Sequence, residues 1–502
     1  MILTILGDLY RLELGKGRAS SFGPKMGHGN FASIDGSICQ QCGPMRFNLF
    51  SNTFSNTPPT KGGSAMRRIG IGGLCLLFSI GTILAFMTGT AVWAQKKEDK
   101  VLFLFASPFS GGYAFLGQRE FWAAEIAIDE INRMGGIKSL GGAKVEIWKK
   151  VDITSDPKMG AAALEGALSS AKSQGVKISS ILGVTVSGMT GPLIPVAEKY
   201  GIPMFAAVGM SSLTELGAKN FFRIFPRNEY WAKAQADFIK EYKEKYNPNF
   251  KKLGIAYEET AWPTDLANLA KDWIFKKYQV PVELVAEVPY PKDLIDATPV
   301  VTKLRAAGAE VVIHNGYAET LYIIRGADAI QYKPLWVGGG GFYVQPEFLT
   351  ERGKEGVRGV VCAMSCNHRW NNPSVDVVNE EFVKKSKLPF IDEHGVAGYA
   401  EVWIAKYGIE KAQSTDPGKV RDALRNMEIV MGSLQDEGKM KGNAYVSPRA
   451  LFVNPGGARL KFNEKGDNIY MAGCLVQWQE VKGKMEPVTV LPEANTPFRL
   501  QR

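Results

Sequence analysis

Residues 178–207 have the sequence ISSILGVTVSGMTGPLIPVAEKYGIPMFAA, and this stretch decides the fold class. The apolar runs ISSILG (178–183) and IPMFAA (202–207) have the length and composition of buried strands. A helix is expected between them, near residues 190–199. Because parallel strands need a crossover of about this length, the stretch predicts a parallel β–α–β unit.

The same alternation continues on both sides of this unit. Before it we expect strands at 101–105 and 145–152, a helix at about 117–134, and an alanine-rich helix after Asp156-Pro157. After it comes a second series of similar length, with strands at 253–258, 282–288, 311–316 and 335–338 and helices at 229–246, 263–278, 297–307 and 317–329. Strands separated by such helices predict an α/β protein with two doubly wound parallel-sheet lobes, each sheet covered on both faces.

The segments that follow these strands are rich in glycine, small polar residues and aromatic residues. They are SPFSGGYAF (107–115), GVTVSGMTG (183–191), AAVGMSS (206–212), YEETAWP (257–263), HNGYAET (314–320) and GGGGFY (338–343). In doubly wound sheets, ligands bind beyond the carboxyl ends of the strands. These loops therefore predict a ligand-binding cleft.

Charge and motifs argue against two classes of function. The chain of 502 residues has a net charge of +10, but residues 1–94 hold eight Lys or Arg against three Asp or Glu, so the other 408 residues carry only +5. There, Lys and Glu alternate, as in EYKEKY (241–246), which is typical of a solvated face and argues against nucleic acid as a partner. The chain has no GxSxG, HExxH or GxGxxG motif, so we expect no enzyme. No cofactor or metal is predicted either.

An export signal is predicted at residues 66–94. Arg67 and Arg68 precede a stretch from Ile69 to Thr90 without charge, and Val92-Trp93-Ala94 suits cleavage before Gln95. The alternative is an uncleaved anchor, because 22 uncharged residues can span a bilayer. Residues 1–65 are expected to be a non-native or disordered extension upstream of the signal, and its single CxxC pair, Cys39 and Cys42, is a weak indication of metal or redox chemistry.

Three cysteines follow the predicted signal: Cys362, Cys366 and Cys474. An odd number in an exported protein allows at most one internal disulfide. Cys362 and Cys366 are close enough in sequence to pair, and burial as ordinary apolar residues is the alternative.

The order of several short motifs resembles the periplasmic branched-chain amino-acid-binding (Leu/Ile/Val-binding) family. The motifs extend over residues 98–480 and are Ser110-Gly111 with Gly117, Asp129-Glu130-Ile131-Asn132 with Gly135-Gly136-Ile137, Asp152 with Asp156-Pro157, Gly183 with Ser187-Gly188 and Thr190, Gly316-Tyr317, and Phe462-Asn463-Glu464-Lys465-Gly466-Asp467. The resemblance implies a type I solute-binding fold, with lobe 1 at 96–228 plus 360–455, lobe 2 at 229–359 plus 456–495, and a hinge of three crossings. It also implies a monomeric extracytoplasmic receptor that closes on a small organic ligand and delivers it to the membrane permease of an ABC transporter. A sensory binding protein would have the same sequence features.

The resemblance also implies a set of ligand-binding residues. Ser187, Gly188 and Thr190 would hold a carboxylate at a helix N-terminus, where the alternative is an ordinary helix cap. Gly209 stands where the family has a threonine, and Ser211 or Ser212 could replace that hydroxyl. The remaining predicted ligand contacts are Trp262, Tyr317, Gly340 and Leu116, while His314 is more easily explained as a structural residue.

Gly340 is the most informative departure from the family. The family captures the ammonium group of an amino acid with a glutamate. In this chain, the position of that glutamate falls within Gly338–Gly341. A buried ammonium without a charge partner is costly, so the sequence predicts a solute that lacks a free α-ammonium group, such as a carboxylate, an aromatic acid or an amide. Glu258, Glu259 or a carboxylate from lobe 1 could replace the missing partner.

Overall fold

A computed structural model describes residues 99–292, 294–369, 372, 374–451, 459–492 and 498–501. The predicted extension (1–65), the signal (66–94) and the pair Cys39 and Cys42 lie outside the described residues. Within the described ranges, no helix has an apolar stretch long enough to cross a bilayer.

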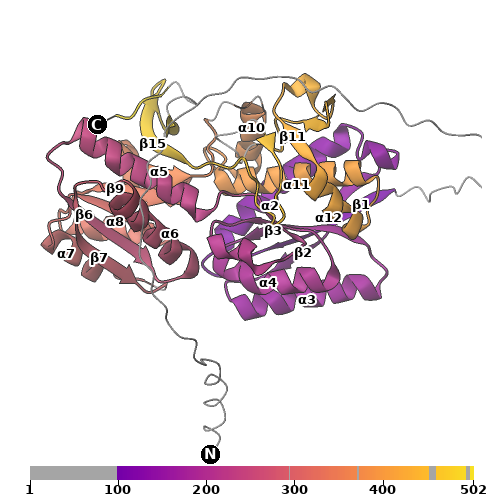
Figure 1. Ribbon diagram of the computed structural model, residues 1–502, viewed down its shortest axis with the longest axis horizontal. Helices are drawn as coiled ribbons and strands as arrows, with labels where there is room; N and C mark the ends of the chain where they lie inside the picture. The colour runs from indigo at the N-terminus through magenta and orange to yellow at the C-terminus, as the bar shows by residue number, and fades with distance from the viewer. Residues whose placement is uncertain are drawn as a thin grey trace, which may run out of the picture. The chain divides into compact units, whose positions relative to one another are not determined.

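The first sheet is parallel and is built around residues 178–207. Across the sheet, its strands are β2 (Lys144–Asp152), β1 (Lys100–Ser107), β3 (Ile178–Thr185), β4 (Met204–Ala207) and β5 (Phe221–Arg223). One face is covered by α3 (Pro157–Ser173) and α4 (Ser187–Tyr200), and the other by α2 (Ala114–Arg133), α11 (Glu393–Ala412) and α12 (Pro417–Asn426) (Figure 1). All eight residues of β3 are buried, as expected for a central strand between two helical layers.

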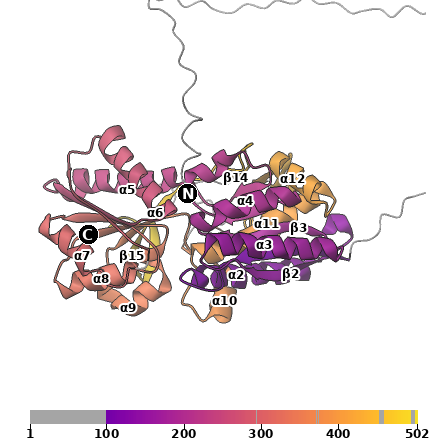
Figure 2. The ribbon, with the colours of Figure 1, turned by 90° about the horizontal axis from the view of Figure 1, so that it is seen from below.

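The second sheet has a parallel part and an antiparallel edge. Across the sheet, its strands are β16 (Lys484–Leu491), β15 (Cys474–Val481), β10 (Val361–Met364), β9 (Leu335–Gly339), β8 (Val311–Asn315), β6 (Lys252–Glu258) and β7 (Glu283–Tyr290). Its helices are α5 (Asn228–Glu241), α6 (Ala261–Lys271), α7 (Thr298–Ala306), α8 (Thr320–Ala329) and α9 (Pro346–Val357) (Figure 2). The two-lobed α/β fold is thus confirmed, with the addition of the hairpin β15–β16, which pairs antiparallel to β10.

The described fold also includes a small third sheet and one further α-helix. They are β12 (Met440–Lys441), β13 (Ala444–Val446), β11 (Glu428–Val430), β14 (Arg459–Leu460) and α10 (Val375–Ser386).

The chain crosses between the two large sheets at positions that differ in part from the predicted ones. Strand β5 ends at Arg223 and α5 begins at Asn228, close to the predicted crossing after 228. Strand β10 pairs with β9, so the chain remains in the second sheet past the predicted boundary at 359/360. Strand β14 pairs with β11, and Asp467 bridges Arg223, so the last crossing follows residue 467 rather than 455. The backbone pairing of the short strands β10 and β14 places these two crossings later in the chain than the sequence predicts.

The three described cysteines are free and buried. Of the two alternatives for Cys362 and Cys366, burial is confirmed. Burial raises the pKa of all three thiols, which keeps them in the protonated, unreactive form.

Helix α11 lies against α2 and is buried on all sides from Glu393 to Ile409. The two helices approach closely at Gly398, where a Cβ atom would overlap the backbone carbonyl of Glu120. This contact fixes the start of α11 relative to the first sheet.

Replacing Gly398 with alanine is therefore expected to lower the free energy of unfolding by about 1–3 kcal/mol, because the added methyl overpacks the helix contact. Gly166→Ala is the matched control: Gly166 is an exposed residue of α3 with open space around its Cα atom. There, alanine should raise stability by about 0.5–1 kcal/mol through its better helix propensity. Urea unfolding of both variants measures the contrast, and two effects of the same sign would contradict it.

Candidate functional site

A small cavity lies at the carboxyl ends of strands from both large sheets. Its volume is about 30 Å³, and its lining residues are Leu116, Val186, Ser187, Ala207, Val208, Gly209, Phe225, Trp231, Trp262, Tyr317, Gly340, Phe342, Glu393 and His394. A solute-sized pocket is roughly ten times larger, so side chains or lobes must move to admit a solute. This is the place where ligands bind in doubly wound sheets.

Six of the nine predicted ligand-binding residues line this cavity and three do not. Those that line it are Leu116, Ser187, Gly209, Trp262, Tyr317 and Gly340. The other three are Gly188, which is exposed, Thr190, whose hydroxyl donates to the carbonyl of Val186 at 3.0 Å, and Ser211, whose hydroxyl donates to Glu229. The six come together because the loops after parallel strands meet at one edge of each sheet.

The N-terminus of α4 forms one end of the cavity. Val186 precedes the helix with a positive φ of 66°, and Ser187 is the first helical residue. The Ser187 hydroxyl accepts a hydrogen bond from the backbone N–H of Met210 at 3.2 Å. A helix N-terminus favours negative charge, so this end suits an anion or a carbonyl oxygen.

Aromatic rings form most of the remaining wall. The ring of Trp262 lies 5.9 Å from that of Trp231 and 5.1 Å from that of Tyr317, and Tyr317 lies 5.2 Å from Phe342. The indole N–H groups of Trp231 and Trp262 are buried and have no hydrogen-bond partner among the described residues. Buried indoles usually donate a hydrogen bond, so each of these two tryptophans retains an unused donor.

Trp231 and Trp262 explain why glycine occupies positions 209 and 340, where the sequence departs from the family. A Cβ atom at Gly209 would overlap the ring of Trp231, and a Cβ atom at Gly340 would overlap the ring of Trp262. Gly340 also has a positive φ of 64°, which glycine adopts at little cost. The rings thus occupy the space that a longer side chain would take at these two positions.

Glu393 and His394, the first two residues of α11, bring titratable groups to the cavity. One Glu393 oxygen, Oε2, accepts a hydrogen bond from the Ser365 N–H at 2.8 Å, whereas Oε1 has no partner among the described residues. Burial raises the pKa of Glu393 to about 8 and lowers the pKa of His394 to about 4. Near pH 7 both groups are therefore mainly uncharged in the folded protein.

A buried ion-pair cluster stands beside α11. Arg119 in α2 is 2% exposed, and its side chain pairs with Asp392 at 2.5 Å and with Glu347 of α9. Asp392 also caps α11 by accepting from the Gly395 N–H at 2.9 Å. The cluster links helices that cover the first and second sheets.

Sequence reasoning missed Glu393, His394 and Trp231. The available signal was Asp392-Glu393-His394 at the start of a segment that is apolar except for Glu401, VAGYAEVWIA (396–405), because such a helix is buried together with the charges at its start. Glu258 and Glu259 do not line the cavity: Glu258 is buried with the Thr260 hydroxyl donating to it at 2.7 Å, and Glu259 is exposed. His314 is buried in the second sheet, 2.6 Å from the Tyr290 hydroxyl.

Comparison with known proteins identifies the family. The model of the periplasmic binding protein family matches residues 103–446. The chain belongs to this family. The predicted resemblance is confirmed, and the chain is a solute-binding protein of the kind that serves ABC transporters.

Relatives and solved structures agree with this assignment. The chain is 26% identical over 426 residues to "Leu/Ile/Val-binding protein homolog 8" of Brucella abortus, covering 83% of this chain and 95% of that protein. A Streptococcus pneumoniae branched-chain amino acid transporter substrate-binding protein in complex with isoleucine has a TM-score of 0.60 at 18% identity, covering 78% and 99% of the two chains. An R. palustris solute-binding protein in complex with 4-hydroxybenzoate has a TM-score of 0.63 at 17% identity, covering 78% and 96%. At these identities the structures show the shared fold.

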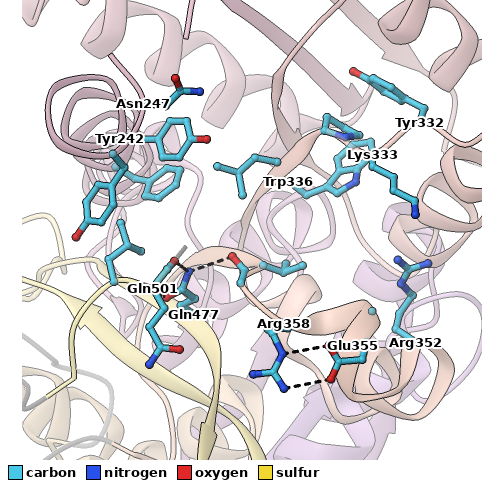
Figure 3. Close-up of a pocket in the computed structure, with 18 of the residues that line it drawn as sticks. Tyr242, Asn247, Tyr332, Lys333, Trp336, Arg352, Glu355, Arg358, Gln477 and Gln501 are labelled. Carbon is cyan, nitrogen blue, oxygen red and sulfur yellow. Dashed lines mark hydrogen bonds and ion pairs between the residues drawn. The ribbon is translucent and has the colours of Figure 1, made fainter. Parts of the chain in front are cut away.

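This periplasmic binding protein has larger cavities elsewhere, and Figure 3 shows one of about 670 Å³. It lies where β9 and β10 begin, at the opposite end of these strands from the site. Its arginines are engaged, Arg358 with Glu355 and Arg352 with Asp328. No group of residues suited to hold a metal ion occurs in the described ranges.

Proposed function

We propose that this periplasmic binding protein captures a small organic carboxylate, amino-acid-like or aromatic, outside the cytoplasm and delivers it to the permease of an ABC transporter. The supporting observation is the cavity that joins residues of both lobes at the carboxyl ends of their strands. The helix N-terminus at Ser187 and the two indole N–H groups offer donors for a carboxylate, and the aromatic rings offer an apolar surface for its body. A relative named Leu/Ile/Val-binding protein homolog, and solved structures of the same fold in complex with isoleucine or 4-hydroxybenzoate, support the same class.

The remaining parts of the proposal concern export, assembly and turnover. The predicted signal at 66–94 would carry the protein out of the cytoplasm, and the mature protein would begin near Gln95 and act as a monomer. The solute would leave the site unchanged, because binding and delivery require no bond to break. N-terminal sequencing of the exported protein tests the first part, and a mature chain that starts before Met66 would contradict it.

Ligand binding should both stabilise and compact the protein. Native mass spectrometry of gently purified protein, followed by a thermal-shift screen of carboxylates, identifies the solute. A solute present at a hundredfold excess over its Kd stabilises the folded state by about 2.7 kcal/mol. Small-angle scattering at saturation should show a smaller radius of gyration, because the lobes close around the solute. An unchanged radius together with unchanged stability for every carboxylate would argue against the proposed function.

A further inference from the structure

The carboxyl group of Glu393 faces the cavity with one oxygen unsatisfied. The residue is 1% exposed, and its Oε1 atom has no hydrogen-bond partner among the described residues. Its other oxygen is held by the Ser365 N–H, which fixes the orientation of the carboxyl group. A buried acceptor in this condition is costly unless something donates to it.

This carboxyl group lies beside the glycine loop that follows β9. A Cβ atom at Gly341 would lie 2.5 Å from Glu393 Oε1, so the absence of a side chain at Gly341 makes room for the carboxyl group. At the neighbouring Gly340, the Trp262 ring takes the space of a side chain. The loop from lobe 2 thus carries no carboxylate of its own, while one from α11 contacts it.

We propose that Glu393 receives the amino group of an amino-acid-like solute, in place of a carboxylate from the loop that follows β9. This inference rests on the proposed function and assigns the residue that selects for an amino group. The donors at Ser187 and the indoles suit the carboxylate end, and the unpaired acceptor at Glu393 suits the ammonium end. The assignment replaces the expectation, drawn from Gly340, of a solute without an ammonium group.

The charge state of Glu393 gives this assignment a second readout. Burial raises the pKa of Glu393 to about 8, and the nearby Asp392 carboxylate adds to the shift. The other titratable groups that face it are the thiols of Cys362, Cys366 and Cys474, which are protonated, and the adjacent His394, which is neutral. An ammonium ion beside Glu393 favours the carboxylate, so the proton leaves for the solvent as the solute binds. The affinity for an amine-bearing solute therefore rises with pH up to about pH 8.

Calorimetry with matched pairs of solutes tests the assignment. The pairs are leucine with 4-methylpentanoate and phenylalanine with 3-phenylpropanoate, and benzoate and 4-hydroxybenzoate serve as amine-free probes. Glu393→Gln should weaken binding of the preferred amino acid at least about 30-fold and leave its des-amino partner nearly unchanged. Glu393→Asp keeps the charge and should retain part of the preference. Glu410→Gln is the control, because Glu410 lies on the same helix but accepts from the backbone of Lys138 and Ser139.

Buffers with different ionisation enthalpies measure the proton release. The wild-type protein and Glu410→Gln should release close to one proton at pH 7 when the amino acid binds, and Glu393→Gln should release almost none.

The possible outcomes separate the proposed function from the assignment of Glu393. If amine-free acids bind the wild type and Glu393→Gln equally and more tightly than the amino acids, the proposed function stands and the assignment of Glu393 is overturned. An amino-acid preference that survives in Glu393→Gln also overturns it. If no probe binds the wild type, the assignment falls together with the proposed class of solute.

Discussion

Replacing Arg119 with methionine is expected to lower the free energy of unfolding by about 3–5 kcal/mol, because it leaves the Asp392 carboxylate buried without its cation. Arg119 is 2% exposed, and methionine keeps a similar apolar stem. Urea unfolding at pH 7 measures the loss. Since Glu347 of α9 also pairs with Arg119, the variant should have a larger radius of gyration in small-angle scattering without solute.

The free energy of unfolding at acid pH provides an independent check on the Arg119–Asp392 pair. Burial by itself raises the pKa of Asp392, but the charge of Arg119 and further hydrogen bonds bring it below the ordinary value. Asp392 thus contributes stability that is present above about pH 4 and is lost as the pH falls through its lower folded-state pKa. Arg119→Met should remove this contribution.

Lys385→Met is the matched control for Arg119→Met. Lys385 pairs with Glu125 at 2.9 Å, but both side chains are about one-third exposed, with exposed fractions of 34% and 37%. Solvent screens such a pair, so its loss should cost less than about 1 kcal/mol. Equal losses from the two variants would show that Arg119 stabilises no more than a surface charge does.

The substitution Gly340→Ala should lower stability by about 2–5 kcal/mol, because it combines backbone strain at a positive φ with overlap of the Trp262 ring. Displacing this ring should also weaken solute binding at least about tenfold, because the indole forms part of the cavity wall. Gly175→Ala is the control, since its φ of 66° matches the 64° of Gly340 while the space around it is open. It should lose only about 1–2 kcal/mol and no affinity.

A double-mutant cycle separates the ring from the backbone. In the Trp262→Ala background, Gly340→Ala should cost less than in the wild type by about 0.5–3 kcal/mol, because the ring that it strikes is gone. Additive losses would mean that strain at residue 340 alone explains the effect.

The sequence predicts the two-lobed fold well because buried parallel strands are continuous apolar runs separated by amphipathic helices. Stretches such as 178–207 therefore identify both the elements and their connection. The short strands β10 and β14 have too few residues to show a period, so the predicted crossings at 359/360 and 455/456 fall early. The hairpin β15–β16 is a local pairing, but its position at the edge of the second sheet depends on the pairing of β15 with β10, more than a hundred residues earlier, which local patterns do not contain.

The candidate site is predictable where it follows from topology. Ser187, Gly209, Trp262, Tyr317 and Gly340 lie just after strands, and the ends of parallel strands meet at one edge. Thr190 lies within α4, where its hydroxyl bonds to the preceding turn. Glu393 reaches the site from a helix more than fifty residues further along the chain than Gly340, so its role emerges only from tertiary packing. The two glycines, similarly, make sense only beside Trp231 and Trp262.

The positions of Ser187 and Glu393 have a kinetic consequence. Both residues lie on helices that cover the first sheet, whereas Trp262 and Tyr317 belong to the second lobe. A solute held by Ser187 at one end and by Glu393 at the other is oriented by the first lobe alone. The aromatic side chains Trp262 and Tyr317, called the aromatic lid here, then close over it. We expect the association rate to depend on the first lobe alone and the residence time to depend on how often the lid lifts. Substitutions at Trp262 would then change the dissociation rate of the solute, and so the time for which it stays bound before delivery, without changing its association rate.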